Sequence, residues 1–310
     1  MLSYTEPTIQ QIKADWLEKA QVELLVRRED ENHVLVSGNK WWKLKYNLEE
    51  ARRLGFTKLL TFGGAYSNHI YATAAAARDF EFESIGVIRG EKTPPLNSTL
   101  QFAENKGMHL HYVSREEYKR KSETAWIETL SKDFGKFYLI PEGGTNNQAV
   151  RGCAEWGKKI LEEMRFDYLC LPVGTGGTLA GLIESLAGKA ELVGFSALKE
   201  GTFLNKEVSK LLTDYSGRLF SNWSISTEYA FGGYAKTNKT LDDFIRDFQD
   251  DHGVPLEPVY TGKMMYGICD LISKGFFDKG STILALHTGG LQSLKMTKDQ
   301  CGYNPIISIN

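Results

Sequence analysis

The chain has 310 residues, of which 42% are hydrophobic and 25% are charged, as in a globular protein large enough for two domains. Its net charge of −2 offers no positive field to hold nucleic acid or an anionic membrane surface. The first residues lack the basic start of a signal peptide, and no apolar run approaches the roughly 18 residues of a spanning helix, so we expect a cytoplasmic protein.

Apolar strand-like runs alternate with segments of helical period, which predicts an α/β protein with parallel sheets. The predicted strands are Val22–Val26, Lys58–Phe62, Ser84–Ile88, Phe137–Ile140, Tyr168–Val173, Leu192–Phe195 and Thr282–Leu286. The predicted helices are Trp41–Leu54, Ser67–Arg78, Leu96–Lys106, Arg115–Lys132, Asn147–Met164, Thr178–Leu186, Leu241–Asp250 and Gly262–Lys274. We place a smaller inserted domain at residues 49–144, which leaves residues 1–48 and 145–310 as the large domain.

The first chemical feature along the chain is Lys40, which follows a Gly-Asn turn at the start of a predicted helix. Trp41 and Trp42 beside the amine would exclude water, lower its pKa and make it a better nucleophile toward an aldehyde. Lys43 lies three residues on, on the same helical face, and is a candidate contact for a phosphate. Lys45 is expected to point to solvent.

The second feature follows a predicted strand that ends in two glycines. Ser67 is a natural N-cap for the alanine-rich helix that begins there. The free N–H groups of a helix start form a receptor for a substrate carboxylate, and Asn68 and His69 add polar contacts. A serine hydrolase would need a G-x-S-x-G elbow, and the second glycine is missing here.

The third feature is a glycine loop between an apolar strand and a helix, made of Gly174, Thr175, Gly176, Gly177 and Thr178. Backbone N–H groups converge at such a helix start, so the loop is a candidate phosphate site. It also fits a loose dinucleotide fingerprint, but its spacing is imperfect and no acidic residue ends the next strand, so a nicotinamide enzyme stays the minority alternative. A lysine together with an anion site indicates pyridoxal phosphate, which needs both.

The chain contains four cysteines. Cys153, Cys170, Cys269 and Cys301 show no CxxC spacing, and Cys170 lies within an apolar run. We therefore expect buried, reduced thiols and no metal site.

Six segments, taken in chain order, resemble those of the D-cysteine desulfhydrase and 1-aminocyclopropane-1-carboxylate (ACC) deaminase family of pyridoxal-phosphate enzymes. The matching segments are Arg27–Asp30, Gly38–Leu44, Gly63–His69, Gly174–Gly181, Pro258–Lys263 and His287–Gly290. The resemblance implies the tryptophan-synthase-β-like fold, with two three-layer domains of open twisted sheets and helices on both faces. It also implies a homodimer that acts on a small amino acid.

The resemblance further implies roles for individual residues. Lys40 would carry the cofactor, Ser67 and Asn68 would face the substrate, and the loop Gly174–Thr178 would hold the phosphate. Tyr234 and Tyr260 match two family tyrosines near the substrate and the lysine. The other implied cofactor contacts are Lys43, Asn68, Thr261 and Thr288.

Position 261 distinguishes the two expected reactions. ACC deaminases have a glutamate there that pairs with the pyridine nitrogen, whereas this chain has Thr261, as desulfhydrases do. A hydroxyl leaves the ring a weaker electron sink, which suits α,β-elimination with a good leaving group. His69 also matches the desulfhydrase pattern, while Tyr66 and Trp42 depart from the family and are expected to reshape the pocket.

We therefore expect elimination of D-cysteine, or a related β-substituted amino acid, to pyruvate, ammonia and hydrogen sulfide. ACC deamination to 2-oxobutanoate is the alternative. A non-catalytic protein that binds pyridoxal phosphate is another.

Overall fold

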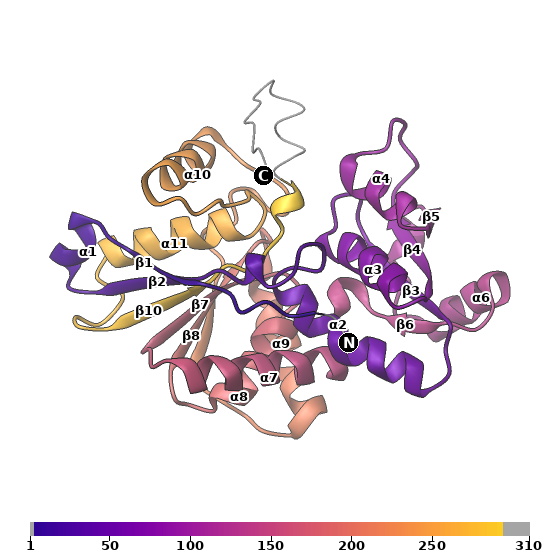
Figure 1. The fold of residues 1–310 in the computed structure, drawn as a ribbon, viewed down its shortest axis with the longest axis horizontal. Coiled ribbons are helices and arrows are strands. Elements are labelled where there is room, and N and C mark those ends of the chain that lie inside the picture. Colours follow the sequence, from indigo (N-terminus) through magenta and orange to yellow (C-terminus); the bar gives the residue numbers. More distant parts are fainter. Residues whose placement is uncertain (1–2, 294–310) are drawn as a thin grey trace.

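The computed structural model describes residues 3–293 and contains two sheets, each with helices on both faces (Figure 1). The helices are α1 (Asp15–Ala20), α2 (Asn39–Arg53), α3 (Asn68–Asp79), α4 (Ser98–Asn105), α5 (Arg115–Lys119), α6 (Thr124–Phe134), α7 (Asn147–Glu163), α8 (Gly177–Leu186), α9 (Leu204–Ser216), α10 (Lys239–His252) and α11 (Thr261–Ser273). The strands are β1 (Ile9–Ile12), β2 (Glu23–Arg27), β3 (Lys58–Gly63), β4 (Glu83–Arg89), β5 (Met108–Val113), β6 (Tyr138–Ile140), β7 (Tyr168–Val173), β8 (Glu191–Ser196), β9 (Trp223–Ser226) and β10 (Thr282–Leu286). The predicted α/β fold with two sheets is confirmed.

The large sheet has the strand order β1-β2-β10-β7-β8-β9, and all its neighbouring pairs are parallel except β1 with β2. Alternate residues of its strands serve two separate cores, as the period of a strand requires. Leu284 and Leu286 pack with residues of α2, α7, α8 and α9, whereas Ile283 and Ala285 pack with residues of α1, α10 and α11. Both faces are therefore covered, and the strand interiors are apolar.

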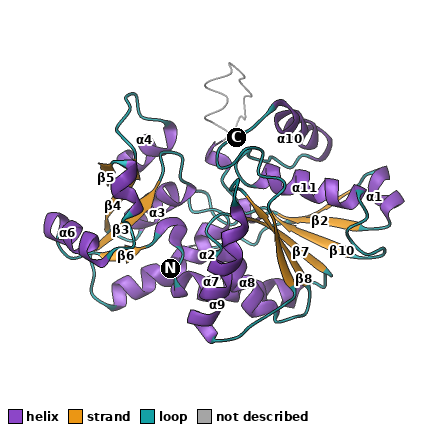
Figure 2. Ribbon diagram, turned by 180° about the vertical axis from the view of Figure 1, so that it is seen from behind, coloured by secondary structure: helices purple, strands orange, loops and turns teal. Residues whose placement is uncertain are grey.

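The small sheet has the order β5-β4-β3-β6, and its pairs are all parallel. Leu60 and Phe62 pack with α5 and α6 on one face, while Ile88 packs with α3 and α4 on the other. Figure 2 shows the small sheet with α6 at one end of the molecule and the large sheet with α1 at the other. All four strands lie inside the predicted insertion, whose boundaries at 49 and 144 stay a prediction.

Two kinds of element were not predicted correctly. The single helix expected over Arg115–Lys132 is wrong, because the polar turn at residues 120–123 separates α5 from α6. A capping box between Ser114 and Glu117 makes α5 a short helix with its own start. The missed elements are α1, α9, β1, β5 and β9. The missed strands include both ends of the large sheet and one end of the small sheet, where polar and apolar residues mix and the apolar signal is weak.

Cys153 and Cys170 are free and buried, and Cys269 is free and partly buried, while Cys301 lies outside the described residues. Within residues 3–293, no helix is both long enough and apolar enough to cross a membrane.

Candidate active site

A cavity of about 490 Å³ lies between the two sheets, near the carboxyl ends of β3, β4 and β7. This is the edge at which open α/β sheets bind ligands. It brings together most of the predicted site residues: Lys40, Lys43, Ser67, Asn68, His69, Gly174, Thr175, Gly176, Thr178, Tyr234, Tyr260 and Thr288. Gly177 and Thr261 are not among the residues that line it.

The turn before Lys40 depends on a glycine. Gly38 has φ +68°, and a Cβ at this position would lie 1.9 Å from the carbonyl oxygen of Thr288. The side chain of Asn32 holds the same turn at both ends, because it accepts from the N–H of Gly38 (2.9 Å) and donates to its carbonyl (3.2 Å). Only glycine fits this approach, which fixes the start of α2 against the segment that carries Thr288.

Lys40 points into the cavity, and its amine donates to Oδ1 of Asn39 at 3.0 Å. Burial, aided by the positive charge of Lys43, lowers the pKa of Lys40 to about 7. Near neutral pH a large share of the amine is therefore unprotonated, as a nucleophile toward an aldehyde requires.

The neighbours of Lys40 differ from the prediction in two respects. Trp41 and Trp42 are buried but do not line the cavity, because they belong to the apolar core behind α2. Trp42 stacks on Trp156 with ring centroids 6.0 Å apart. Lys45 does not point to solvent, since its amine forms an ion pair with Glu155 at 2.7 Å. The two indoles therefore pack α2 against the core and do not cover the amine of Lys40.

The glycine loop faces Lys40 from the end of β7. Gly176 has φ +81° and precedes the first turn of α8, whose leading N–H groups have no partner within the helix. Asn39 donates to the hydroxyl of Thr178 at 2.9 Å and so joins the lysine turn to the loop. Lys43 is buried with its amine 3.0 Å from the hydroxyl of Thr145, and burial lowers its pKa to about 8.

The small sheet contributes the segment after β3. Ser67 caps α3, because its hydroxyl accepts from the N–H of Ile70 at 3.2 Å. Ser67 and Asn68 line the cavity and are partly exposed. The first N–H groups of α3 therefore begin at the cavity wall, as a carboxylate receptor requires.

His69 is held in one tautomer by its neighbours. Thr61 donates its hydroxyl proton to the carbonyl of Ile140 (2.8 Å) and so accepts from Nε2 of His69 (2.8 Å). Nδ1 has no hydrogen-bond partner among residues 3–293. Burial and the nearby lysine charges keep the pKa of His69 well below its ordinary value, so the ring is a neutral acceptor.

Tyr234 and Tyr260 approach the cavity with ring centroids 6.0 Å apart. Burial raises the pKa of Tyr234, and a hydrogen bond from Tyr260 opposes that rise. Behind them, Glu257 accepts from the N–H groups of Val259, Tyr260 and Thr261 at 2.6–2.7 Å. This fully buried carboxylate fixes the start of α11.

Thr261 belongs to the same turn. Its hydroxyl accepts from the N–H of Glu257 at 3.0 Å and lies 3.3 Å from that carboxylate. Thr261 is fully buried: it stabilises this turn and does not line the cavity.

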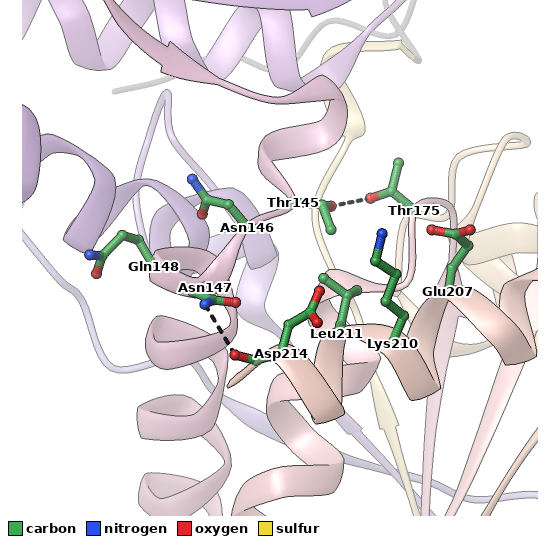
Figure 3. A pocket seen from close by; sticks show the side chains of 9 residues that line it. All are labelled: Thr145, Asn146, Asn147, Gln148, Thr175, Glu207, Lys210, Leu211 and Asp214. Carbon is green, nitrogen blue, oxygen red and sulfur yellow. Dashed lines mark hydrogen bonds between the residues drawn. The ribbon is translucent and has the colours of Figure 1, made fainter. Parts of the chain in front are cut away.

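A second cavity of about 490 Å³ adjoins the first, since Thr175 and Glu207 line both (Figure 3). It is lined by Thr145, Asn146, Asn147, Gln148, Thr175, Glu207, Lys210, Leu211 and Asp214. Thr145 shares a short hydrogen bond with Thr175, shown in Figure 3, and so links Lys43 with the glycine loop. Lys40 and both tyrosines line the first cavity, which is therefore the candidate active site.

Sequence reasoning missed part of the lining. The additional residues are Asn39, Gly64, Arg89, Lys121, Glu142, Gly143, Pro172, Val173, Leu179, Leu198, Phe203, Leu204 and Glu207. Arg89 is the last residue of β4, so the rule that ligands bind at the carboxyl ends of parallel strands would have found it. Phe203, Leu204 and Glu207 lie at or near the start of α9, which was not predicted.

These residues fit pyridoxal phosphate. The cofactor requires an amine for its aldehyde, and Lys40 supplies one that is enclosed and largely neutral. It also requires an anion receptor, and the glycine loop offers a helix start with Lys43 beside it. Both groups line one cavity, so a single ligand can reach them.

Comparisons with known proteins agree with this chemistry. A family model described as "Pyridoxal-phosphate dependent enzyme" matches residues 6–289. The chain is 32% identical over 299 residues to a bifunctional D-cysteine desulfhydrase/1-aminocyclopropane-1-carboxylate deaminase, mitochondrial, of Arabidopsis thaliana, covering 90% of this chain and 75% of the relative. It is 27% identical to a D-cysteine desulfhydrase of Salmonella typhi, covering 88% of each.

A solved structure of an ACC deaminase homologue superposes with a TM-score of 0.83 at 28% identity, covering 97% of this chain and 94% of that one. The agreement in fold therefore extends over nearly the whole chain, including both sheets.

Proposed function

This chain belongs to the family of pyridoxal-phosphate-dependent enzymes, and on that premise we propose that it is a lyase that eliminates the β-substituent of a small amino acid, most simply D-cysteine. The observation that carries the proposal is the meeting of Lys40, the glycine loop and the start of α3 in one cavity. The relatives named as desulfhydrase and as ACC deaminase support both the proposal and its alternative.

The roles follow from the positions of the side chains. Ser67, Asn68 and the first N–H groups of α3 bind the substrate carboxylate. Lys43 and the glycine loop bind the cofactor phosphate. Bound pyridoxal phosphate supplies an electron sink for the charge that forms at Cα when the α-proton leaves.

Lys40 is the base in this proposal. The neutral Nζ of Lys40 would accept the α-proton of the bound substrate, and the Cβ–S bond would then break with the electron pair leaving on sulfur. Tyr234 and Tyr260 lie on the same cavity wall and hold or move a proton at their hydroxyls. Hydrolysis of the unsaturated product gives pyruvate and ammonia.

Position 261 favours elimination over ring opening. Thr261 supplies no carboxylate there, and the neighbouring Glu257 is engaged with three backbone N–H groups. A pyridine ring without a carboxylate partner is the weaker electron sink, which is sufficient when thiolate leaves.

The direct test is a mass-spectrometric assay for 2-oxo acids on cofactor-loaded protein given D-cysteine and ACC together. Pyruvate would support elimination, and 2-oxobutanoate would support the deaminase alternative. The absence of both products would contradict both functions. K40A should lower turnover by at least about 10³-fold. K45M is the matched control on the same helix and should stay within about threefold of the unaltered protein. Retained turnover in K40A would contradict the assignment of the base.

We further propose, from the resemblance, a homodimer whose large domain comprises residues 1–48 and 145–310. Light scattering should then give a mass near twice 34.9 kDa, and a monomer would contradict it. The cytoplasmic location stays a prediction from the sequence.

A further inference from the structure

Arg89 ends β4 at the cavity wall, where the proposed reaction gives it no role. Its Nη2 lies beside Gly64, so close that a Cβ on that glycine would be 3.4 Å from it. Gly64 begins the turn that leads to Ser67, the proposed carboxylate receptor. The guanidinium therefore stands next to the place where the substrate is expected to bind.

The charges around the cavity set Arg89 apart. Three of the four Lys and Arg side chains that line it have protein partners: Lys40 donates to Asn39, Lys43 donates to Thr145, and Lys121 pairs with Glu142 at 3.5 Å. The side chain of Arg89 has no hydrogen bond or ion pair among residues 3–293, and its Cζ lies 5.6 Å from the ring centroid of Tyr118.

The acidic groups nearby do not neutralise Arg89. Glu142 already accepts from the hydroxyl of Tyr118 at 2.8 Å and pairs with Lys121. Glu207, the other carboxylate of the lining, is exposed on α9 and also borders the second cavity. The exposed guanidinium of Arg89 thus borders the cavity without a carboxylate partner among the described residues, beside the loop proposed to bind the α-carboxylate.

We propose that Arg89 selects amino acids whose β-substituent carries an oxyanion, such as a carboxylate or a sulfate ester. A guanidinium presents paired N–H donors in a plane that matches two oxygens of such a group. The α-carboxylate would bind Ser67 and the start of α3, leaving Arg89 for the second anion. This inference rests on the proposed function and narrows its substrate class.

The corresponding reaction is balanced without an added oxidant or reductant. With serine O-sulfate, the α-proton passes to Lys40 and the Cβ–O bond breaks, so sulfate leaves with the electron pair. Water then converts the unsaturated amine to pyruvate and ammonia.

The first test measures binding to the cofactor-loaded protein by calorimetry, using aspartate and its neutral isostere asparagine, each as both enantiomers. One enantiomer of aspartate should bind about 10- to 100-fold more tightly than the same enantiomer of asparagine. R89M should bring the ratio close to one, and R89K should leave an intermediate ratio. R115M, which removes an exposed arginine away from the cavity, is the matched control and should keep the full ratio.

The second test compares turnover of serine O-sulfate and 3-chloroalanine, both of which yield pyruvate. R89M should lower kcat/KM for serine O-sulfate by about 10- to 100-fold and for 3-chloroalanine by less than about threefold. An aspartate preference that survives R89M, or equal losses on the two substrates, would overturn the inference and leave the proposed function intact. Conversely, an Arg89-dependent aspartate preference without pyruvate from any substrate would support the anion site and reject the proposed lyase.

Discussion

The two walls of the cavity are built differently. The large-sheet wall comprises Lys40, residues Gly174, Thr175, Gly176 and Thr178 of the glycine loop, Tyr260 and Thr288. Behind it stand polar residues that are almost wholly buried: Glu29, Asn32, Glu257 and Lys263 are at most 1% exposed. The small-sheet wall comprises Gly64, Ser67, Asn68, His69 and Arg89, and most of these side chains retain exposure.

This difference separates two tasks. A reactive lysine must be held in one position and kept from water, so its support is buried and fully hydrogen-bonded. A substrate must enter and leave, and groups that choose between substrates must be reachable from solvent. We therefore expect changes behind the large-sheet wall to cost stability as well as turnover, and changes on the small-sheet wall to alter substrate binding.

The largest expected effect is that of E29A, behind the large-sheet wall. Glu29 accepts hydrogen bonds from Arg27, Asn32, Trp42 and Trp156. Its removal leaves Glu163 as the one carboxylate partner of Arg27 among residues 3–293 and should lower the free energy of unfolding by about 3–5 kcal/mol in urea titrations. E116A removes an exposed ion pair instead and should cost less than about 1 kcal/mol. Equal losses of unfolding free energy in E29A and E116A would contradict the claim that the buried polar residues behind the large-sheet wall stabilise the fold more than an exposed ion pair does.

The second prediction concerns the turn that carries Tyr234. The buried amine of Lys263 donates to the carbonyls of Ala230 and Gly233 at 2.8 and 2.7 Å. K263M leaves each carbonyl with only a backbone donor, the N–H of Gly233 or of Lys236, and removes the amine that joins the turn to α11. The turn should then loosen, so kcat should fall about 10- to 100-fold while KM changes little. K274M, which removes an exposed cation just after α11, is its control. An unchanged kcat in K263M would show that the turn needs no such anchor.

The third prediction is a pH dependence of cofactor capture. The pKa of Lys40 lies near 7, because burial and the charge of Lys43 disfavour its protonated form. Since only the neutral amine attacks an aldehyde, the capture rate should rise up to about tenfold per pH unit below pH 7 and level off above it. Stopped-flow absorbance after mixing cofactor-free protein with pyridoxal phosphate would measure this capture rate at each pH. A rate that keeps rising through about pH 9 would indicate an ordinary lysine.

The smallest expected effect is that of S67A, on the small-sheet wall. Loss of the N-cap of α3 should cost about 1 kcal/mol of stability, and loss of the hydroxyl should raise KM several-fold. N238A removes the cap of α10 from a helix that does not line the cavity, so it should cost similar stability without changing KM. If both variants leave KM alone, Ser67 is a helix cap and nothing more.

The two walls also differed in how far the sequence could predict them. The lysine turn and the glycine loop stand in continuous motifs after a turn or a strand, so local reasoning found them together with the α/β class. Arg89 and Glu142 carry no motif, because each becomes part of the cavity only when parallel strands place their carboxyl ends side by side. The indole positions were wrong for a related reason. The sequence puts Trp41 and Trp42 beside Lys40, but the helical turn directs them into the opposite core.

The most direct test of the central claim is borohydride reduction of the cofactor-loaded protein, followed by peptide mapping. The account predicts that the reduced cofactor label lies on Lys40 alone, with Lys43, Lys45 and Lys263 unmodified. A label on any of those other lysines, or no label at all, would contradict the assignment of Lys40 as the residue that carries pyridoxal phosphate.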